Sequence, residues 1–324
     1  MTTQLAPSSA LFLANVNRIE QRITAANSQI SSGKRLNVAS DSPDQVDSLL
    51  QMRADQLRNT QIQSNLTLAG ADASAADNAL SSSISLMDRA IQLATQGANS
   101  TQNADTRNSI AEEVASIQTQ MVAYSQTQVQ GRYIFSGDLD GSATYQLNLL
   151  PPPDPSVPVD PSAPVDPATV TGVTQLSNAA STRQVEDPAG GSFVVSKTAQ
   201  QIFDDTNADG SPASDNVFAA LNSLRLALLS NDQTGITNSI NSLQAASGHL
   251  NDMEGFYGAV QNRIQAATSF ATQYNIQLQT EVSNTEDADV TSAAVELTQA
   301  NTQLQAAFQA QGKMPTNTLF DYLG

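Results

Sequence analysis

The sequence predicts a mainly α-helical protein: an elongated bundle of long antiparallel helices formed by both chain ends, with a small β-rich domain inserted in the centre. Three observations carry this prediction. Apolar residues recur at helical steps of three and four over both ends of the chain. Gly and Pro are nearly absent from the first 130 residues. Most prolines and several short β-prone runs lie instead between residues 131 and 215.

The first predicted helix is amphipathic and ends at Gly33. Its apolar residues alternate steps of four and three, which is the spacing of a helix that packs along a partner helix. They are Phe12, Val16, Ile19, Ile23, Ala26 and Ile30. Gly33 is the expected stop because glycine readily adopts the left-handed conformation in which many helices end.

A second, much longer helix is expected to open near Asp41-Ser42-Pro43 and to run to about Thr95. A capping residue followed by proline in the first turn is typical of a helix start. At 1.5 Å per residue this helix would be about 80 Å long, which favours a rod over a globule. A turn at residues 97–105 and a third helix, with apolar residues from Ile110 to Tyr124, follow.

The central insert has a different composition. Short β-prone runs are expected at residues 133–135, 144–149, 170–174 and 193–195. Within the Pro-rich tract 151–167, proline recurs at every third residue from Pro155 onward, which is the period of a polyproline II helix. The tract is interpreted as a stiff spacer or surface loop, with a ligand for an aromatic groove as the alternative.

Helical spacing returns after the insert. Val217 to Leu228 form one stripe with Asp215 placed to cap it, Ile236 to Leu278 form a longer one, and a final stripe runs from Val290 to Phe308.

The pattern divides the chain into five segments. These are an N-terminal assembly segment (1–40), an N-terminal long-helix half (41–131), a β-rich, Pro-containing outer domain (132–215), a C-terminal long-helix half (216–283) and a C-terminal assembly segment (284–324).

Charge and composition exclude several function classes. The net charge of −17 disfavours nucleic acid and anionic membrane surfaces as partners. No apolar run approaches the roughly 20 residues of a membrane span. The chain has no Cys and one His, and no phosphate-binding, nucleophile-elbow or metal-protease motif occurs. The sequence therefore predicts no catalytic residue, no cofactor and no metal, and the protein is not expected to be an enzyme.

The two ends are expected to form the assembly surface. Residues 1–37 carry a net charge of +3 and residues 281–324 a net charge of −5, so the ends should attract each other or the ends of neighbouring copies. The alternative is that both ends complete one intramolecular bundle. The predicted subunit-assembly residues are Phe12, Val16, Ile19, Ile23, Ile30, Val290, Leu297, Leu304, Phe308, Leu319 and Leu323.

At both ends, short motifs resemble those of the bacterial flagellin family. Ile-Ser-Ser-Gly-Lys-Arg-Leu-Asn at 30–37 and Ala-Ser-Asp-Ser-Pro at 39–43 resemble its N-terminal signature. Glu-Asp-Ala-Asp-Val at 286–290, Glu-Leu-Thr-Gln-Ala-Asn at 296–301 and Leu-Phe-Asp-Tyr-Leu at 319–323 resemble its C-terminal signature. The positions that stand out are Gly33, Asn37, Asp41, Pro43, Asp287 and Asp289.

Within this family, two features resemble the proteins of the junction between hook and filament more than the filament subunit. One is Asp-Ser-Pro at 41–43. The other is the Gly-x-Tyr-x-Phe-x-Gly turn formed by Gly131, Tyr133, Phe135 and Gly137.

The resemblance implies a structural component of the bacterial flagellum. It implies export by the flagellar type III apparatus without a cleaved signal peptide, and polymerisation outside the cell as an adaptor between hook and filament. The implied partners are copies of itself, a hook-associated junction protein on the hook side, flagellin on the filament side and an export chaperone. A filament flagellin and, less favoured, an adhesin on a coiled-coil stalk remain alternatives.

Three weaker candidates complete the sequence analysis. Residues 205–216 match the first half of a calcium loop, but Asn216 stands where a bidentate Glu is needed, so a polar turn is favoured over a cation site. His249 has no partner motif and is interpreted as an ordinary surface or packing residue. Residues 88–98 resemble a flagellin stretch read by innate immune receptors; an inter-subunit packing face is the favoured interpretation.

Overall fold

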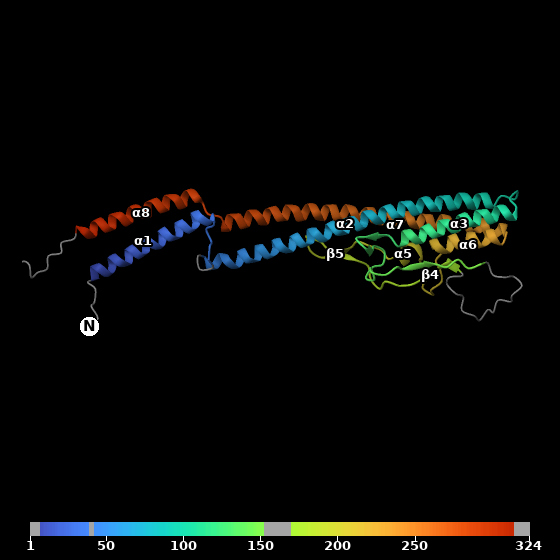
Figure 1. Ribbon diagram of the computed structural model, residues 1–324, viewed down its shortest axis with the longest axis horizontal. Helices are drawn as coiled ribbons and strands as arrows, with labels where there is room; N and C mark the ends of the chain where they lie inside the picture. Colours follow the sequence, from blue (N-terminus) through green and yellow to red (C-terminus); the bar gives the residue numbers. More distant parts are fainter. Residues whose placement is uncertain (1–6, 39–41, 152–169, 314–324) are drawn as a thin grey trace, which may run out of the picture. The chain divides into compact units, whose positions relative to one another are not determined.

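The computed structural model describes residues 7–38, 42–151 and 170–313 (Figure 1). Its helices are α1 (Pro7–Ser32), α2 (Pro43–Gly97), α3 (Ala104–Ser125), α5 (Ala199–Phe203), α6 (Val217–Leu229), α7 (Gln233–Glu286) and α8 (Val290–Gly312). Long helices from both ends of the chain and a small β-rich centre confirm the predicted fold class. The Pro-rich tract lies outside the described residues except for its first residue.

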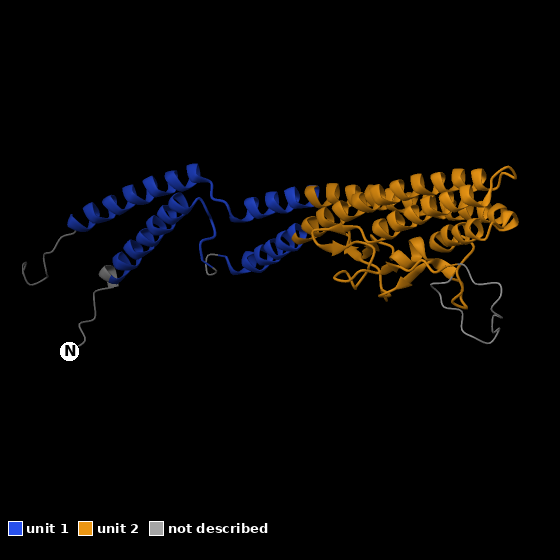
Figure 2. Cartoon of the chain, turned by 45° about the vertical axis from the view of Figure 1, so that its right-hand side comes forward, with its two compact units in different colours: residues 1–60, 273–324 blue, residues 61–272 orange. Residues whose placement is uncertain are grey.

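Residues 1–60 and 273–324 form one compact unit, called unit 1, and residues 61–272 form a second, called unit 2 (Figure 2). Helices α2 and α7 contribute residues to both units. Each unit includes helices from both halves of the chain. The two units therefore do not test the division into five consecutive segments, which stays a prediction.

The predicted helix boundaries agree closely with the structure at the N-terminal half. Helix α1 ends directly before Gly33, whose φ of 69° places it in the left-handed region. Helix α2 begins at Pro43 and contains 55 residues. For α6 the predicted cap is wrong: Asn216, rather than Asp215, accepts a hydrogen bond from the backbone N–H of Ala219 at 2.8 Å.

The core of unit 2 is a bundle of helices from both halves of the chain. Fully buried apolar residues line α2, α3, α6 and α7, among them Leu80, Met121, Leu221 and Leu250. Gly70 of α2 faces Ile264 of α7, and a Cβ atom at position 70 would make an ordinary van der Waals contact with a methyl group of Ile264 at 3.7 Å. The antiparallel halves therefore depend on each other for burial of their apolar stripes.

Three two-stranded antiparallel sheets, the first of them a hairpin, form the β-rich part of unit 2 within the described residues. They pair β1 (Gln128–Val129) with β2 (Arg132–Tyr133), β3 (Tyr145–Leu147) with β4 (Val173–Gln175), and β5 (Gln184–Glu186) with β6 (Ser192–Val194). The β-prone runs lie at or beside β2, β3, β4 and β6, whereas the sequence pattern does not predict β1, β5 or helix α5.

The first hairpin explains the start of the Gly-x-Tyr-x-Phe-x-Gly motif. Its two-residue loop consists of Gln130 and Gly131, with φ of 53° and 78°. Positive φ at both central residues is the requirement of a type I′ turn, and glycine meets it without steric cost. Gly137, at the other end of the motif, has φ of 52°, and a Cβ atom there would clash with the carbonyl oxygen of Ser181. Only glycine fits at that position.

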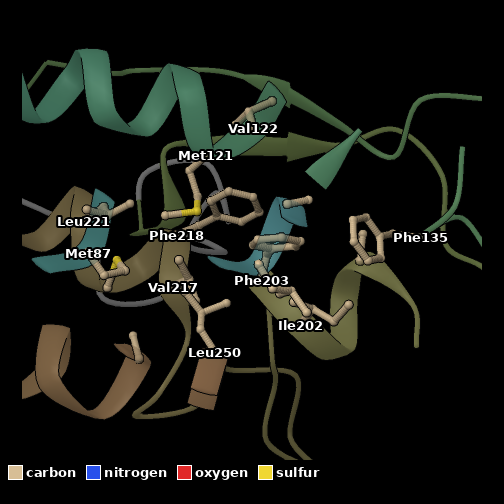
Figure 3. Packing of buried hydrophobic residues seen from close by; sticks show 14 of the residues in the cluster. Met87, Met121, Val122, Phe135, Ile202, Phe203, Val217, Phe218, Leu221 and Leu250 are labelled. Carbon is tan, nitrogen blue, oxygen red and sulfur yellow. The ribbon is translucent and has the colours of Figure 1, made fainter. Parts of the chain in front are cut away.

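A cluster of aromatic rings joins the β-rich part to the helices (Figure 3). Phe135 meets Phe203 of α5 edge to face at 5.8 Å between ring centroids, and Phe203 stacks on Phe218 of α6 at 6.0 Å. Phe135 also contacts Tyr257 of α7 at 6.2 Å. The motif residue Phe135 is therefore a core residue that packs on α5 and α7, and Phe203 extends the cluster to α6.

Arg183 clamps the same motif to helix α2. Its guanidinium donates to the backbone carbonyl of Tyr133 at 3.1 Å and to the carboxylates of Asp72 at 2.9 Å and Asp140 at 3.1 Å. The side chains of Arg183 and Asp72 are 18% and 17% exposed. A buried charge without its partner is costly, so removal of Arg183 should destabilise unit 2.

We expect Arg183→Ala to lower the free energy of unfolding of unit 2 by about 3 kcal/mol, because it leaves the Asp72 carboxylate without its nearest cation. Urea unfolding followed by far-UV circular dichroism measures the change. Arg132→Ala is the matched control, since the more exposed Arg132 lies 3.5 Å from Asp72 and should cost less than about 1 kcal/mol. Equal losses in the two variants would contradict the clamp.

Candidate assembly surface

Helices α1 and α8 of unit 1 lie side by side (Figure 2). The residues buried between them are small: Val16 and Ala26 on α1, and Ala293 and Ala300 on α8. Small side chains let two helices approach closely, but each covers little apolar area. The contact is therefore close and only modestly apolar.

The predicted assembly residues occupy this contact to different extents. Val16 is buried, Val290 and Phe308 are 47% and 54% exposed, and Leu319 and Leu323 lie outside the described residues. Half-buried positions are Phe12, Ile19, Ile23, Ile30, Leu297 and Leu304. Within the described residues, the structure thus brings the two predicted seams onto the same pair of helices.

At one end of the pair, Phe12 and Phe308 meet edge to face, with ring centroids 6.3 Å apart. This geometry is favoured by the ring quadrupoles. Since Phe308 remains half exposed, the contact leaves apolar ring surface open to solvent.

Sequence spacing did not identify several large apolar residues that point away from the seam. Leu11 and Leu13 on α1 are 68% and 46% exposed, and Val295 on α8 is 62% exposed. A shallow hollow on α8 is lined by Val290, Thr291, Ala294, Val295, Thr298 and Gln299. A helix pair with exposed apolar residues of this size is suited to cover by another protein surface.

The charges predicted to attract the two ends do meet. Arg22 of α1 donates to Glu296 of α8 at 2.5 Å and to the side-chain carbonyl of Gln303 at 2.8 Å. The hydrogen bond between Arg22 and Glu296 lowers the pKa of Glu296 and raises that of Arg22. Both side chains are well exposed, so the pair adds specificity of register more than stability.

The connection between α1 and α2 lies against the connection between α7 and α8. The backbone N–H of Arg35 donates to the carbonyl of Glu286 at 2.6 Å, and that of Ala288 donates to the carbonyl of Gly33 at 2.9 Å. Lys34 and Asp287 form an antiparallel bridge. These bonds hold residues from opposite ends of the sequence in one short two-stranded contact.

Glu286 is the electrostatic centre of this junction. Its side chain is 7% exposed, and its two carboxylate oxygens lie 2.5 Å from Lys34 Nζ and 2.6 Å from Arg53 Nη2. The hydrogen bond from Lys34 holds the pKa of Glu286 below its usual range, with a further contribution from Arg53. One carboxylate thus ties the end of α7 to α2 and to the connection after α1.

The family-signature residues at the chain ends have structural roles at this junction. Gly33 terminates α1, and Asn37 donates its side-chain amide to the carbonyl of Lys34 at 3.0 Å. Pro43 opens α2, and Asp289 caps α8 by accepting from the N–H groups of Thr291 and Ser292. Asp287 also accepts a short hydrogen bond from Ser283, and Asp41 lies outside the described residues.

The other signature residues, Gly131, Tyr133, Phe135 and Gly137, lie in unit 2, where they shape the first hairpin and the aromatic cluster. They belong to the fold of unit 2 and not to the α1–α8 pair. No helix in the described ranges has the length and apolarity needed to cross a bilayer.

Two family sequence models match the chain. The bacterial flagellin N-terminal helical region matches residues 4–140, and the bacterial flagellin C-terminal helical region matches residues 234–323, together more than half of the chain. The chain belongs to the bacterial flagellin family. The resemblance of both chain ends to this family is thereby confirmed.

Individual members of the family extend the comparison. Flagellar hook-associated protein 3 of Escherichia coli (strain K12) is 24% identical over 316 residues, which cover 90% of each chain. The crystal structure of hook-associated protein 3 from Legionella pneumophila has a TM-score of 0.57 at 13% identity, covering 74% of this flagellin-family chain and 98% of that one. FlgL of Bacillus cereus has a TM-score of 0.51 at 15% identity, covering 73% and 100%. These structures share the fold.

We expect Glu286→Gln to loosen the junction of unit 1, with a loss of about 1–2 kcal/mol in local stability, because the amide cannot replace two charge-assisted bonds. Hydrogen–deuterium exchange of segments 33–38 and 286–289 should become faster. Glu281→Gln is the control, since Glu281 is exposed on the same helix and its carboxylate accepts from Gln277, one turn away. Unchanged exchange in Glu286→Gln would show that the carboxylate does not hold the junction.

The same contact predicts a pH dependence. Because the pKa of Glu286 is lower in the folded protein than in the unfolded chain, its contribution is present above the unfolded value of about 4.3. It is lost as pH falls through the lower folded value. Junction exchange in the wild type, corrected for intrinsic rates, should therefore rise on acidification in that window, and the rise should be smaller in Glu286→Gln.

Proposed function

We propose that the chain is a structural subunit of the bacterial flagellum that polymerises through α1 and α8 and serves as an adaptor between hook and filament. The observation that carries the proposal is the α1–α8 pair, which binds the two chain ends together yet keeps Leu11, Leu13 and Val295 exposed. Family membership supports a flagellar role, and the relative with the name hook-associated protein 3 matches over 90% of both chains.

The adaptor role is favoured over that of a filament subunit by the central motif. The Gly-x-Tyr-x-Phe-x-Gly turn, which resembles junction proteins, is built into the core of unit 2 through Phe135 and Gly137. Asp-Ser-Pro at 41–43 points the same way, and Pro43 is the first residue of α2. A filament flagellin remains the second candidate because the same helix pair would suit it.

The proposal includes the partners and the route. Copies of the chain would contact one another laterally, a hook-associated junction protein would bind on the hook side, and flagellin would bind on the filament side. The chain would leave the cell through the flagellar type III apparatus with an export chaperone and without signal cleavage, and would act in the extracellular flagellum. The absence of Cys supports passage of an unfolded chain. A non-enzymatic role follows from this proposal.

Deletion of the gene tests the adaptor role. Because an adaptor is needed before filament growth, deletion should leave hooks without filaments and release flagellin into the medium, as seen by electron microscopy and by immunoblotting of culture supernatant. Complementation with the full chain should restore filaments. Full-length filaments on the deletion strain would refute the adaptor role, and loss of the filament subunit itself from the supernatant would favour the filament flagellin.

A point variant tests the assembly surface. Leu11→Asp should block polymerisation of purified protein and filament formation in cells, because a charge in an apolar contact between subunits would be left unpaired. Leu11 is 68% exposed, so the isolated chain should keep its circular dichroism spectrum. Asn17→Asp is the control: it adds the same charge to α1 at an exposed position that is already polar. Normal polymerisation of Leu11→Asp would remove this face from the assembly surface.

A further inference from the structure

A second site lies in unit 2, where helix α7 passes the connection between α5 and α6. Asp205, Asp215 and His249 each offer one ligand atom, and these atoms all lie within 4.8 Å of one another. We infer that these three side chains bind a divalent transition-metal cation such as Zn²⁺. The inference is independent of the flagellar role.

The structure does not form the calcium loop considered from the sequence. In residues 205–216, the last position is taken by Asn216, whose oxygen caps α6 and whose amide donates to Asp204 at 2.8 Å and to the carbonyl of Asp205 at 2.9 Å. The Asp209 carboxylate accepts from the N–H and the hydroxyl of Ser211, so it is engaged in hydrogen bonds within the turn. The loop therefore closes on itself and presents Asp205 and Asp215 toward α7 instead.

The orientation of the His249 ring favours a metal ligand over a simple ion pair. Nε2 lies 2.9 Å from the carbonyl oxygen of Gln201, which can only accept, so Nε2 carries a proton. Nδ1 is then left facing Asp215 Oδ2 at 3.4 Å, beyond the usual 2.7–3.2 Å of an N–H···O hydrogen bond. In most metal-bound histidines, one ring nitrogen binds the metal and the other donates its N–H to a carbonyl or carboxylate oxygen, which fixes the orientation of the ring.

The spacing also suits a tetrahedral ion. With metal–ligand bonds of about 2.0–2.1 Å, two ligand atoms of a tetrahedral site are about 3.3 Å apart, close to the separation of His249 Nδ1 and Asp215 Oδ2. The ligand oxygen of Asp205 lies within 4.8 Å of both atoms, so it would move closer to them when an ion binds. Two carboxylates, one imidazole and one water would complete four ligands.

The surroundings carry excess negative charge. The Asp204 carboxyl lies next to Asp205 in the chain and accepts from the side-chain amide of Asn216 at 2.8 Å. His249 is 13% exposed on its side chain and Asp215 is 34% exposed, so the site is partly shielded and still open to an ion. A cation here would relieve the repulsion and fix the α5–α6 connection to α7.

The chain offers one histidine, which makes the test direct. Tag-free protein, stripped with EDTA, is titrated with ZnCl₂ by calorimetry, and the single imidazole is followed by ¹⁵N NMR. We expect one Zn²⁺ per chain and a shift of the Nδ1 resonance with Nε2 still protonated. Ca²⁺ should not displace Zn²⁺, because Ca²⁺ prefers six to eight oxygen ligands.

Variants separate the site from diffuse electrostatic attraction. Asp215→Asn and His249→Gln should each weaken Zn²⁺ binding by at least roughly tenfold. Asp209→Asn removes the same charge from the same loop outside the three ligands and should bind normally. An imidazole unmoved by excess Zn²⁺ would overturn the inference in favour of a His249–Asp215 ion pair, as would equal loss of binding in Asp209→Asn. If a variant fails to fold, the wild-type imidazole shift alone decides.

Discussion

The constraint on which the rest of this structure depends is that each long helix carries a narrow apolar stripe, which the helix cannot bury by itself. The covering partner comes from the opposite end of the sequence in both units. Helix α1 is covered by α8 in unit 1, and in unit 2 Gly70 of α2 lies against Ile264 of α7. The apolar stripes of α1 and of the α2 segment facing α7 are therefore covered only when the C-terminal half of the chain is also present.

The connections between the helices need a different kind of stabilisation, because they have no stripe to bury. In unit 1 this is electrostatic: the nearly buried carboxylate of Glu286 binds Lys34 and Arg53 at the point where α1 ends and α8 begins. In unit 2, Arg183 plays the corresponding part and binds Asp72 and Asp140. Each of these two ion-pair clusters joins segments that are far apart in sequence. Each therefore fixes the axial register between the segments, which contacts between apolar stripes alone would leave variable.

Sequence reasoning succeeded where the physical signal is local. The stripe from Phe12 to Ile30 and the glycine at position 33 predict α1 and its end, since both period and left-handed stop lie within one segment. Helix α5 was missed because five residues are too short to display a helical period. Asn216 caps α6 in place of Asp215 because its side-chain amide also donates to the Asp204 carboxylate and to the carbonyl of Asp205. A carboxylate could not make these two bonds, and the sequence around position 216 alone does not indicate them. Leu11 and Val295 lie off the seam spacing and are exposed, so the helical period of the seam does not predict a role for them.

The alternatives of pairing within a chain and pairing between chains use different residues of the same two helices. The fully buried residues of the seam within the chain are small, the larger ones such as Ile19 and Leu304 are half-buried, and burial of an alanine methyl contributes only about 0.8 kcal/mol. Ala26, Ala293 and Ala300 therefore align α1 with α8 without making the pair very stable. The larger apolar groups, including Leu11, Val295 and the open side of Phe308, would gain far more if a neighbouring subunit covered them. A weak intrachain contact that sets the register, followed by a stronger interchain contact, is the order in which such a surface can assemble without aggregating first.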